Sequence, residues 1–450
     1  MSNTSSCVAL DEKNLENDAK LEEGHTAEKE VETKPQRRNG WQLLKDLYPI
    51  FIIIVAFSID MSLYLNSIYP YIQSLTSDQA SYYYALTLSL TAVAQIIVSF
   101  SVGYIAEKIG SLKLVVVSLM FLYCVGNLLY SLASPGALNH VGWVVVGRTL
   151  CGAAEGSGSL GNAYIAVATT KEERLQAMSM FRTFMILGLV SPGLASLLGL
   201  CNFYIGHYHI NNYTAPPLFN TLLTVILNII VALKLKDIKR PAVSPMQGIR
   251  EIFKVGPSAL LFLQFSSAFA VSTVQFLMPY TFWEIFHYGT SLQGGIMAAI
   301  LIVSMIGPLF SHNLNAFLKK FSGPGQAEIL LSAYSFFVVF IGNLIMLLVL
   351  VLNSESVGTQ IVWILGATIC YTAYNLQAGV HPSLFSKLIE PKYTVSLMPW
   401  MIGMLAIAKI AAPEVGTPLL ASKVYAIPIA LCLVSGGLGL LLKSRLSTSD

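Results

Sequence analysis

The stretch Gly103-Tyr-Ile-Ala-Glu-Lys-Ile-Gly-Ser-Leu-Lys113 is a short polar turn between two long apolar runs. Glycine at its start and at Gly110 allows two helix backbones to approach closely and to turn tightly. Glu107, Lys108 and Lys113 can form ion pairs across the turn or with the terminus of a neighbouring helix. The stretch therefore predicts a helical hairpin whose two arms lie in an apolar medium.

Apolar runs like the two beside this turn recur along the whole chain. Of its 450 residues, 54% are hydrophobic and 11% are charged, whereas an ordinary soluble domain has about 25% charged residues. A bilayer core needs about 20 consecutive apolar residues for each helical span. On this criterion we expect an all-α membrane protein with twelve transmembrane helices, near residues 48–71, 82–106, 113–133, 141–168, 177–201, 216–235, 257–283, 291–311, 327–352, 360–385, 395–415 and 424–442.

The predicted spans divide into two groups of six. The sequence predicts a disordered cytoplasmic tail, two six-helix bundles joined by a cytoplasmic linker, and a short second tail, at residues 1–46, 47–235, 236–256, 257–442 and 443–450. In the second bundle, the connection 312–323 keeps Lys319, Lys320 and Gly323 but little else of the pattern at 103–113. This is weak support for an internal repeat.

The distribution of basic residues predicts the orientation of the chain, because cytoplasmic loops carry an excess of lysine and arginine. We assign 24 of the 27 lysine and arginine residues to the tails and the even-numbered connections, counting Arg182 with the connection before it, and only Arg148, Lys409 and Lys423 elsewhere. Both termini are therefore expected in the cytoplasm. Asn212 begins the sequon Asn-Tyr-Thr in a loop on the opposite side, so it is a candidate for N-glycosylation.

Polar residues recur on one face of the predicted fourth span. Arg148, Glu155 and Asn162 are spaced seven residues apart, which is two helical turns. An ionisable group at mid-bilayer costs about 2.5 to 3.5 kcal/mol, so it normally faces a wet cavity or a charged partner. Asp60 of the first span is a candidate partner. Two readings stay open, a role in function and a structural ion pair.

Further polar residues lie on the seventh and tenth spans, and we expect them to line a translocation path with those of the first and fourth. They are Gln264, Gln275, Tyr371 and Asn375. The alternative is that such side chains only hydrogen-bond between helices, at around 1 kcal/mol each. On the eleventh span, Lys409 and Glu414 are five residues apart and could form a gate or a mutual ion pair.

Two of these segments resemble motifs of the major facilitator superfamily. Residues 103–113 are similar to its signature loop G-x-L-A-D-R-x-G-R-R-K, although Ser111 and Leu112 replace two usual basic residues, and Arg148 begins a match to its fourth-helix motif R-x-x-x-G. The resemblance implies two six-helix halves whose first, fourth, seventh and tenth helices line a central cavity. It also implies that Arg148 takes part in proton or anion handling.

Several stretches resemble one lysosomal branch of this superfamily, the branch linked to neuronal ceroid lipofuscinosis. These are residues 67–73, 168–174, 210–216, 384–391 and 417–425. The resemblance implies an endolysosomal membrane protein that passes chloride or another small anion. This chain departs from the branch, which has an arginine at Asn162 and a basic residue near Glu414. An acidic dileucine sorting signal needs an acidic residue four positions before a leucine pair, and Asn39 stands at that position before Leu43 and Leu44. The signal is therefore missing, and the plasma membrane is the alternative location.

Three functional hypotheses follow. The first is movement of a small anion, with Arg148 as the fixed positive site and proton coupling through Glu155 and Asp60. The second is a proton-coupled porter of an organic solute that uses either carboxylate as the proton carrier. The third is a membrane scaffold that transports nothing. No catalytic layout, phosphate loop or metal-ligand spacing stands out, so we expect no enzyme and no cofactor. The net charge of +3 implies no nucleic-acid partner.

Overall fold

The first half of the chain forms long helices and one short hairpin. The structure is a computed structural model that describes residues 38–76, 78–134, 137, 140–191, 198, 201–238, 245–288, 290–323, 326–352, 356–416 and 426–446. The first half, as the term is used below, comprises α2 (Gly40–Leu75), α3 (Ala80–Ile109), α4 (Leu112–Leu132), α5 (Val141–Glu155), α6 (Ser157–Ala168), α7 (Arg174–Leu189), β1 (Phe203–Ile205), β2 (Tyr208–Ile210) and α9 (Ala215–Lys234). The strands β1 and β2 pair antiparallel, with Phe203 opposite Ile210.

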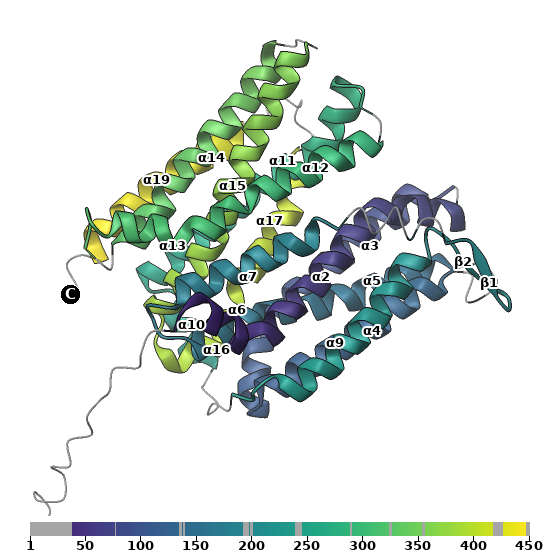
Figure 1. Cartoon of the computed structure of the whole chain (residues 1–450), viewed down its shortest axis with the longest axis horizontal. Helices are drawn as coiled ribbons and strands as arrows, with labels where there is room; N and C mark the ends of the chain where they lie inside the picture. Colours follow the sequence, from purple (N-terminus) through teal and green to yellow (C-terminus); the bar gives the residue numbers. More distant parts are fainter. Residues whose placement is uncertain are drawn as a thin grey trace, which may run out of the picture. The chain divides into compact units, whose positions relative to one another are not determined.

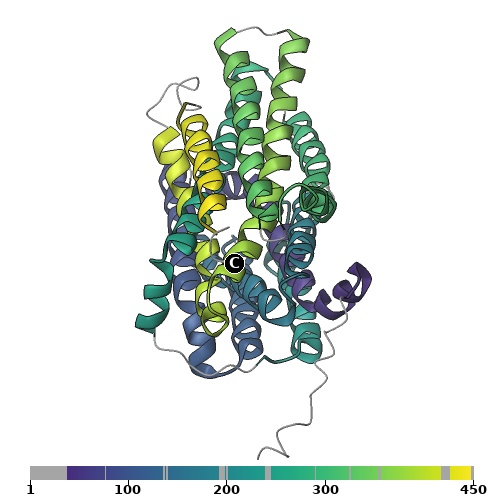
Figure 2. The same ribbon diagram turned by 90° about the vertical axis from the view of Figure 1, so that its left-hand side faces the viewer.

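The regular elements of the second half are all helices among its described residues. A short linker helix, α10 (Pro245–Ile252), precedes it. The second half comprises α11 (Val255–Tyr280), the π-helix η1 (Thr281–Ile285), α12 (Thr290–Ser304), α13 (Ile306–Leu318), α14 (Ala327–Leu352), α15 (Val357–Leu388), the 3-10 helix η2 (Pro391–Tyr393), α16 (Thr394–Leu397), α17 (Trp400–Gly416) and α19 (Ala426–Leu446). Figures 1 and 2 show α14, α15 and α19 side by side.

Nine helices of the described residues are long and apolar enough to cross a membrane. The other predicted spans, 141–168, 177–201 and 424–442, fall on shorter helical pieces. The first is divided at Gly156 into α5 and α6, the second is described as a helix only to Leu189, and the third has a short apolar core, Ile427–Leu441. The membrane character of the chain follows directly from these helices.

Two predicted boundaries move in the structure. α2 begins at Gly40, inside the predicted N-terminal tail, and α19 continues to Leu446, beyond the predicted end of the last span. Residues 1–37 and 447–450 lie outside the described residues. The predicted disorder of the N-terminal tail therefore stays a prediction. The division into two six-helix bundles stays a prediction.

The turn at 103–113 joins α3 to α4 as a tight helical hairpin. Gly110 ends α3 in the left-handed region, with φ of 74°, and its N–H donates to the carbonyl groups of Ala106 and Glu107. Ser111 caps α4 by accepting a hydrogen bond from the Leu114 N–H, and its hydroxyl donates to Asp237 at 2.8 Å. The serine at a usually basic position therefore ties the turn to the segment that follows α9.

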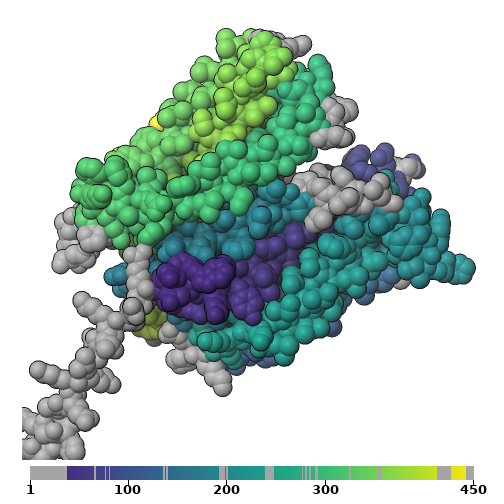
Figure 3. All heavy atoms as spheres, in the orientation of Figure 1, coloured from purple at the N-terminus to yellow at the C-terminus, as the bar shows by residue number. Residues whose placement is uncertain are grey.

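The two halves touch at one end of the helices. α3 packs on α16 and α17, and α7 packs on α12, α13 and α15. We call this end, which carries the connections 108–113, 171–174, 319–320 and 387–392, the basic end. Toward the opposite end, Figure 3 shows the surface hollowed between the two halves. The described unit is thus closed at the basic end and parted at the other.

Candidate translocation site

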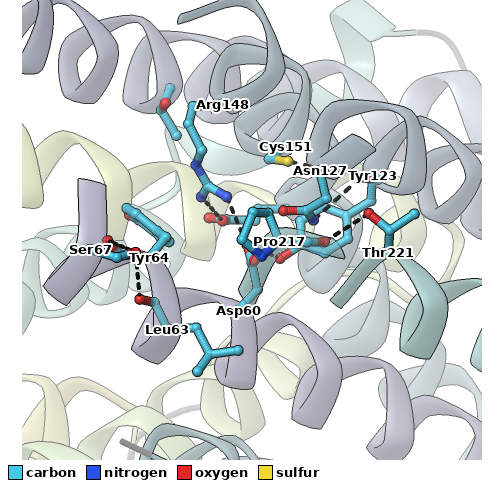
Figure 4. Close-up of polar contacts among 12 residues, drawn as sticks. Asp60, Leu63, Tyr64, Ser67, Tyr123, Asn127, Arg148, Cys151, Pro217 and Thr221 are labelled. Atoms are coloured by element: carbon cyan, nitrogen blue, oxygen red, sulfur yellow. Dashed lines mark hydrogen bonds and ion pairs between the residues drawn. The ribbon is translucent and has the colours of Figure 1, made fainter. Parts of the chain in front are cut away.

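The centre of the first half is a buried ion pair between α2 and α5. The Arg148 guanidinium donates from Nη1 to Asp60 Oδ2 at 2.8 Å, and the same oxygen accepts the Tyr123 hydroxyl at 2.6 Å. Figure 4 shows the three side chains converging from three helices. Arg148 is fully buried and Asp60 is 1% exposed. A buried pair depends on such direct bonds, although Nε and Nη2 of Arg148 have no hydrogen-bond partner among the described residues.

Aromatic rings enclose the Arg148 guanidinium. Its central carbon lies 3.7 Å from the centroid of the Tyr64 ring and 5.9 Å from that of Tyr130. A ring face attracts a cation while it excludes water. The sequence spacing predicted Arg148 and Asp60 but missed these tyrosines, because their contribution depends on how α2, α4 and α5 are rotated.

Glu155 is the second carboxylate beside Arg148, and it is held far more loosely than Asp60. Its Oε1 lies 3.6 Å from Arg148 Nη2, and no hydrogen bond to that oxygen is found among the described residues. Its side chain is 14% exposed, compared with 2% for Asp60. Arg148 and Glu155 thus share a face, as their spacing predicts. Asn162 lies on α6, beyond the tight turn at Gly156, where it is buried and belongs to neither ion pair.

A second buried cation, Arg182, was missed by the sequence analysis, which assigned it to a connection. Arg182 lies within α7 and is 8% exposed. Its Nε and Nη2 donate to Asn375 Oδ1 of α15 at 3.0 and 2.6 Å. Asn375 in turn donates to the Ser304 hydroxyl of α12 at 2.8 Å. The position of Arg182 inside the predicted span 177–201 was the signal that could have identified it.

The remaining predicted path residues are placed differently from one another. Gln264 bonds to the buried His381 ring at 3.0 Å inside the second half, an arrangement that fits packing between helices. Gln275 is half-buried on α11. Tyr371 is 6% exposed on α15, one turn before Asn375. The structure therefore brings Tyr371 and Asn375 to the same region as Arg182, and it separates Gln264 from them.

Lys409, one of the two predicted gate residues, lies partly exposed on α17. It is close enough to Glu155 and Arg182 to interact electrostatically with both. The side chain of Glu414 lies outside the described residues, so the expected gate stays a prediction. Lys409 thus faces a carboxylate of the first half across the boundary between the halves.

Close backbone contacts and hydrogen bonds seal the basic end. A Cβ atom at Gly103 would lie 2.3 Å from the Val395 carbonyl oxygen, so α3 and α16 meet with no room for a side chain. Glu107 accepts a hydrogen bond from the Ser396 N–H at 3.1 Å. Lys108 and Lys113 lie beside this contact on the signature loop, and the Lys113 N–H donates to Asp237 at 3.2 Å.

Two further contacts join α7 to the second half. Arg174 donates to the Ser386 carbonyl at 2.8 Å, and the Ser311 hydroxyl donates to that of Ser179 at 2.7 Å. All the hydrogen bonds found between described residues of the two halves lie between the basic end and the level of Arg182. The halves are thus in contact at the basic end and apart at the opposite end. Alternating access requires a carrier to adopt such an arrangement in one of its two states.

Several ion pairs lie at the basic end, outside the membrane spans. Lys254 pairs with Glu251 at 2.6 Å and with Glu390 at 3.6 Å. The hydrogen bond from Lys392 holds the pKa of Glu390 below its ordinary value, and the hydrogen bond to Glu251 raises the pKa of Lys254. Glu251 is buried, whereas the pairs of Glu390 are exposed on both sides and contribute little to stability.

The comparison with protein families agrees with the helices and their packing. The model of the Major Facilitator Superfamily matches residues 50–413, so the chain belongs to this family of membrane transporters. It is 26% identical to the MFS-type transporter PUL3 of Kluyveromyces lactis over 81% of this chain and 88% of that one. It is 26% identical to major facilitator superfamily domain-containing protein 8 of Xenopus laevis over 48% of this chain and 43% of that one.

Solved structures support the same fold. The human organic anion transporter MFSD10 superimposes with a TM-score of 0.70 at 15% identity, covering 89% of this chain and 98% of that one. FucP in its outward conformation superimposes with a TM-score of 0.67 at 15% identity, covering 89% and 99%. The family match and the similarity to major facilitator superfamily domain-containing protein 8 confirm the resemblance described from the sequence.

Proposed function

We propose that this transporter couples proton movement to the movement of a small organic solute, with Glu155 as the proton carrier. The observation that carries this proposal is the unequal bonding of two carboxylates to one arginine. Asp60 accepts hydrogen bonds from both Arg148 and Tyr123, whereas Glu155 lies 3.6 Å from Arg148 and is partly exposed. The hydrogen bonds commit Asp60 to the buried ion pair, so we assign the proton to the loosely held Glu155.

The charged groups around Glu155 determine what its protonation changes. The ionisable groups that face it are Arg148 and Cys151 of its own helix, Asp60 and Tyr64 of α2, Tyr123 of α4 and Lys409 of α17. Only Lys409 belongs to the second half. Protonation of Glu155 therefore removes an attraction between the halves while the Arg148–Asp60 pair stays intact, which links proton binding to their separation.

Chloride or another small anion has less support as the substrate. That hypothesis uses Arg148 as a fixed positive site, but Arg148 already lies against two carboxylates and is fully buried. We further propose twelve transmembrane helices with both termini in the cytoplasm, because the basic connections gather at one end. An endolysosomal location and glycosylation at the exposed Asn212 remain our proposals from the lysosomal resemblance and the sequon.

Proton flux in liposomes tests this function directly. We would reconstitute the full-length protein in liposomes that contain the pH-sensitive dye pyranine and add single monosaccharides, amino acids or carboxylates outside at pH 5.5. At least one solute should acidify the interior, and Glu155→Gln should abolish the acidification. Glu172→Gln, which changes an exposed carboxylate of the basic end, is the matched control and should behave as wild type.

The same liposomes distinguish the competing function. If no solute moves protons but a voltage drives chloride out of the vesicles in an Arg148-dependent manner, the small-anion hypothesis replaces ours. If Glu155→Gln acidifies the interior as fast as wild type does, Glu155 is not the carrier and the proposal fails.

A further inference from the structure

We propose that the transported solute is an organic anion, and that Arg182, Lys409 and Tyr371 bind its negatively charged group. This inference rests on the proposed function, because it identifies the class of solute that the proton accompanies. It concerns the boundary between the halves, where α7 faces α15 and α17, and it does not involve the Arg148 pair.

Arg182 is a buried cation whose described partners are all neutral. Its guanidinium bonds to the Asn375 amide oxygen and the Met185 sulfur, and it lies 4.9 Å from the centroid of the Tyr374 ring. No ion pair between Arg182 and a carboxylate is found within the described residues. A charge buried without a counter-ion is strongly destabilising, so a site of this kind is suited to an anion that arrives from outside the chain.

Tyr371 supplies an unused hydrogen-bond donor in the same region. Its hydroxyl is buried and has no hydrogen-bond partner among the described residues. It lies close enough to Arg182 to interact electrostatically with it. Burying a hydroxyl without a partner is unfavourable, and an acceptor on a bound solute would offset that cost.

Lys409 is the second cation near Arg182, and it too forms no carboxylate ion pair within the described part of the chain. Two like charges repel each other, so their proximity favours the binding of a negative group between them. Asn375 fixes the guanidinium in place because its own amide is held by Ser304. The region therefore offers two cations and a hydroxyl donor, and its bonded amide serves as support.

The charge balance links the anion to the proton. When all groups are ionised, the two negative charges of Asp60 and Glu155 stand against the three positive charges of Arg148, Lys409 and Arg182, which leaves one positive charge uncompensated. Protonation of Glu155 raises this excess to two positive charges and removes the attraction that Glu155 exerts on Lys409. Each ligand should therefore strengthen the binding of the other, which is the behaviour of a symporter.

Anion binding can be measured without any proton gradient. We would follow the Tm of the purified full-length protein with benzoate, benzenesulfonate, and their neutral amides benzamide and benzenesulfonamide. We expect at least one anion, and neither amide, to raise the Tm. Arg182→Gln and Lys409→Gln should weaken this binding about tenfold or more and Tyr371→Phe about threefold, in proportion to charged and neutral hydrogen bonds. Lys319→Gln, which removes an exposed cation, is the control and should have no effect.

The pH dependence of the same assay tests the link to the proton. Benzenesulfonate stays ionised throughout, so its binding should tighten between pH 7.5 and 5.5 in wild type and be independent of pH in Glu155→Gln. A purely structural role for Arg182 predicts instead that Arg182→Gln lowers the Tm of the unliganded protein sharply. On our proposal that Tm is unchanged or higher, because an uncompensated buried charge has been removed.

The outcomes separate this inference from the proposed function. Binding of the amides as tightly as the anions, or no anion-dependent rise in Tm, overturns the anion site. Acidification by a neutral solute in the liposome assay would then leave proton coupling intact. If the anions bind through Arg182 and Lys409 but no solute moves protons, the anion site is retained and the proton-coupled function is lost.

Discussion

The two carboxylates beside Arg148 have different roles because their surroundings differ. Asp60 holds the buried guanidinium together with Tyr123, whereas Glu155 is partly exposed and loosely bound. Removing one partner from a buried ion pair leaves an uncompensated charge and costs about 3 to 5 kcal/mol. Changing a loosely bound, partly exposed carboxylate costs much less.

We therefore expect opposite effects of two conservative substitutions. Asp60→Asn should lower the Tm of the detergent-solubilised protein strongly, while Glu155→Gln should change it little but abolish proton-coupled transport. Thermal unfolding followed by tryptophan fluorescence measures the first effect, and the liposome assay measures the second. Equal losses of Tm would show that both carboxylates are structural.

Tyr123 offers a finer test of the same pair. Tyr123→Phe removes the 2.6 Å hydrogen bond to Asp60 and retains the ring. A hydrogen bond to a charged group contributes about 1.5 to 3 kcal/mol, so the Tm should fall, but less than in Asp60→Asn. Tyr204→Phe, in the exposed β1 strand, is the matched control and should keep the wild-type Tm.

At the scale of helices, the contact between α3 and α16 depends on the absence of a side chain at Gly103. A methyl group there would clash with backbone atoms that have no room to move, since the nearest is the Val395 carbonyl oxygen at 2.3 Å. Such a clash is relieved only if the helices separate. The basic end can close fully only with glycine at this position.

The single methyl group of Gly103→Ala should therefore shift the protein toward a state that is open at the basic end and slow its transport. Gly437→Ala adds the same methyl group where no atom lies within 4 Å and should be neutral. Limited proteolysis of the connection between α3 and α4 reports the opening. Unchanged proteolysis in Gly103→Ala would mean that the helices accommodate the methyl group without separating.

The sequence predicted the positions of the helices better than their rotations, because hydropathy determines the first and packing determines the second. Hydropathy predicts where helices lie, and the spacing of Arg148 and Glu155 correctly placed them on one face. It could not foresee the tight turn at Gly156 between α5 and α6, nor the rotation that turns Gln264 toward His381. Arg182 was overlooked because counting charges by connection concealed a buried cation in the middle of α7.

Across the whole molecule, closure of the basic end holds the two halves in one arrangement. The hydroxyls of Ser179 and Ser311 lie 2.7 Å apart across that boundary. Transport by alternating access requires this boundary to open in every cycle. A covalent link at this point should therefore stop the cycle.

Ser179→Cys combined with Ser311→Cys tests whether the boundary opens. Mild oxidation should form a disulfide, because the two oxygens are already in contact, and should halt solute-driven acidification. Reduction should restore it. Each single substitution, oxidised in the same way, is the control and should stay active. Continued transport by a fully cross-linked double variant would exclude opening at this boundary.

The hydrogen bonds across the basic end have a consequence for the rate of the transport cycle. Glu107, Arg174, Ser179 and Arg182 each bond to a residue of the second half, and these bonds must break together when the seal opens. Each contributes about 1 kcal/mol, which corresponds to roughly a fivefold change in rate if the bond is lost before the barrier is crossed. Small polar substitutions along this boundary can therefore set the turnover of the carrier without touching the solute.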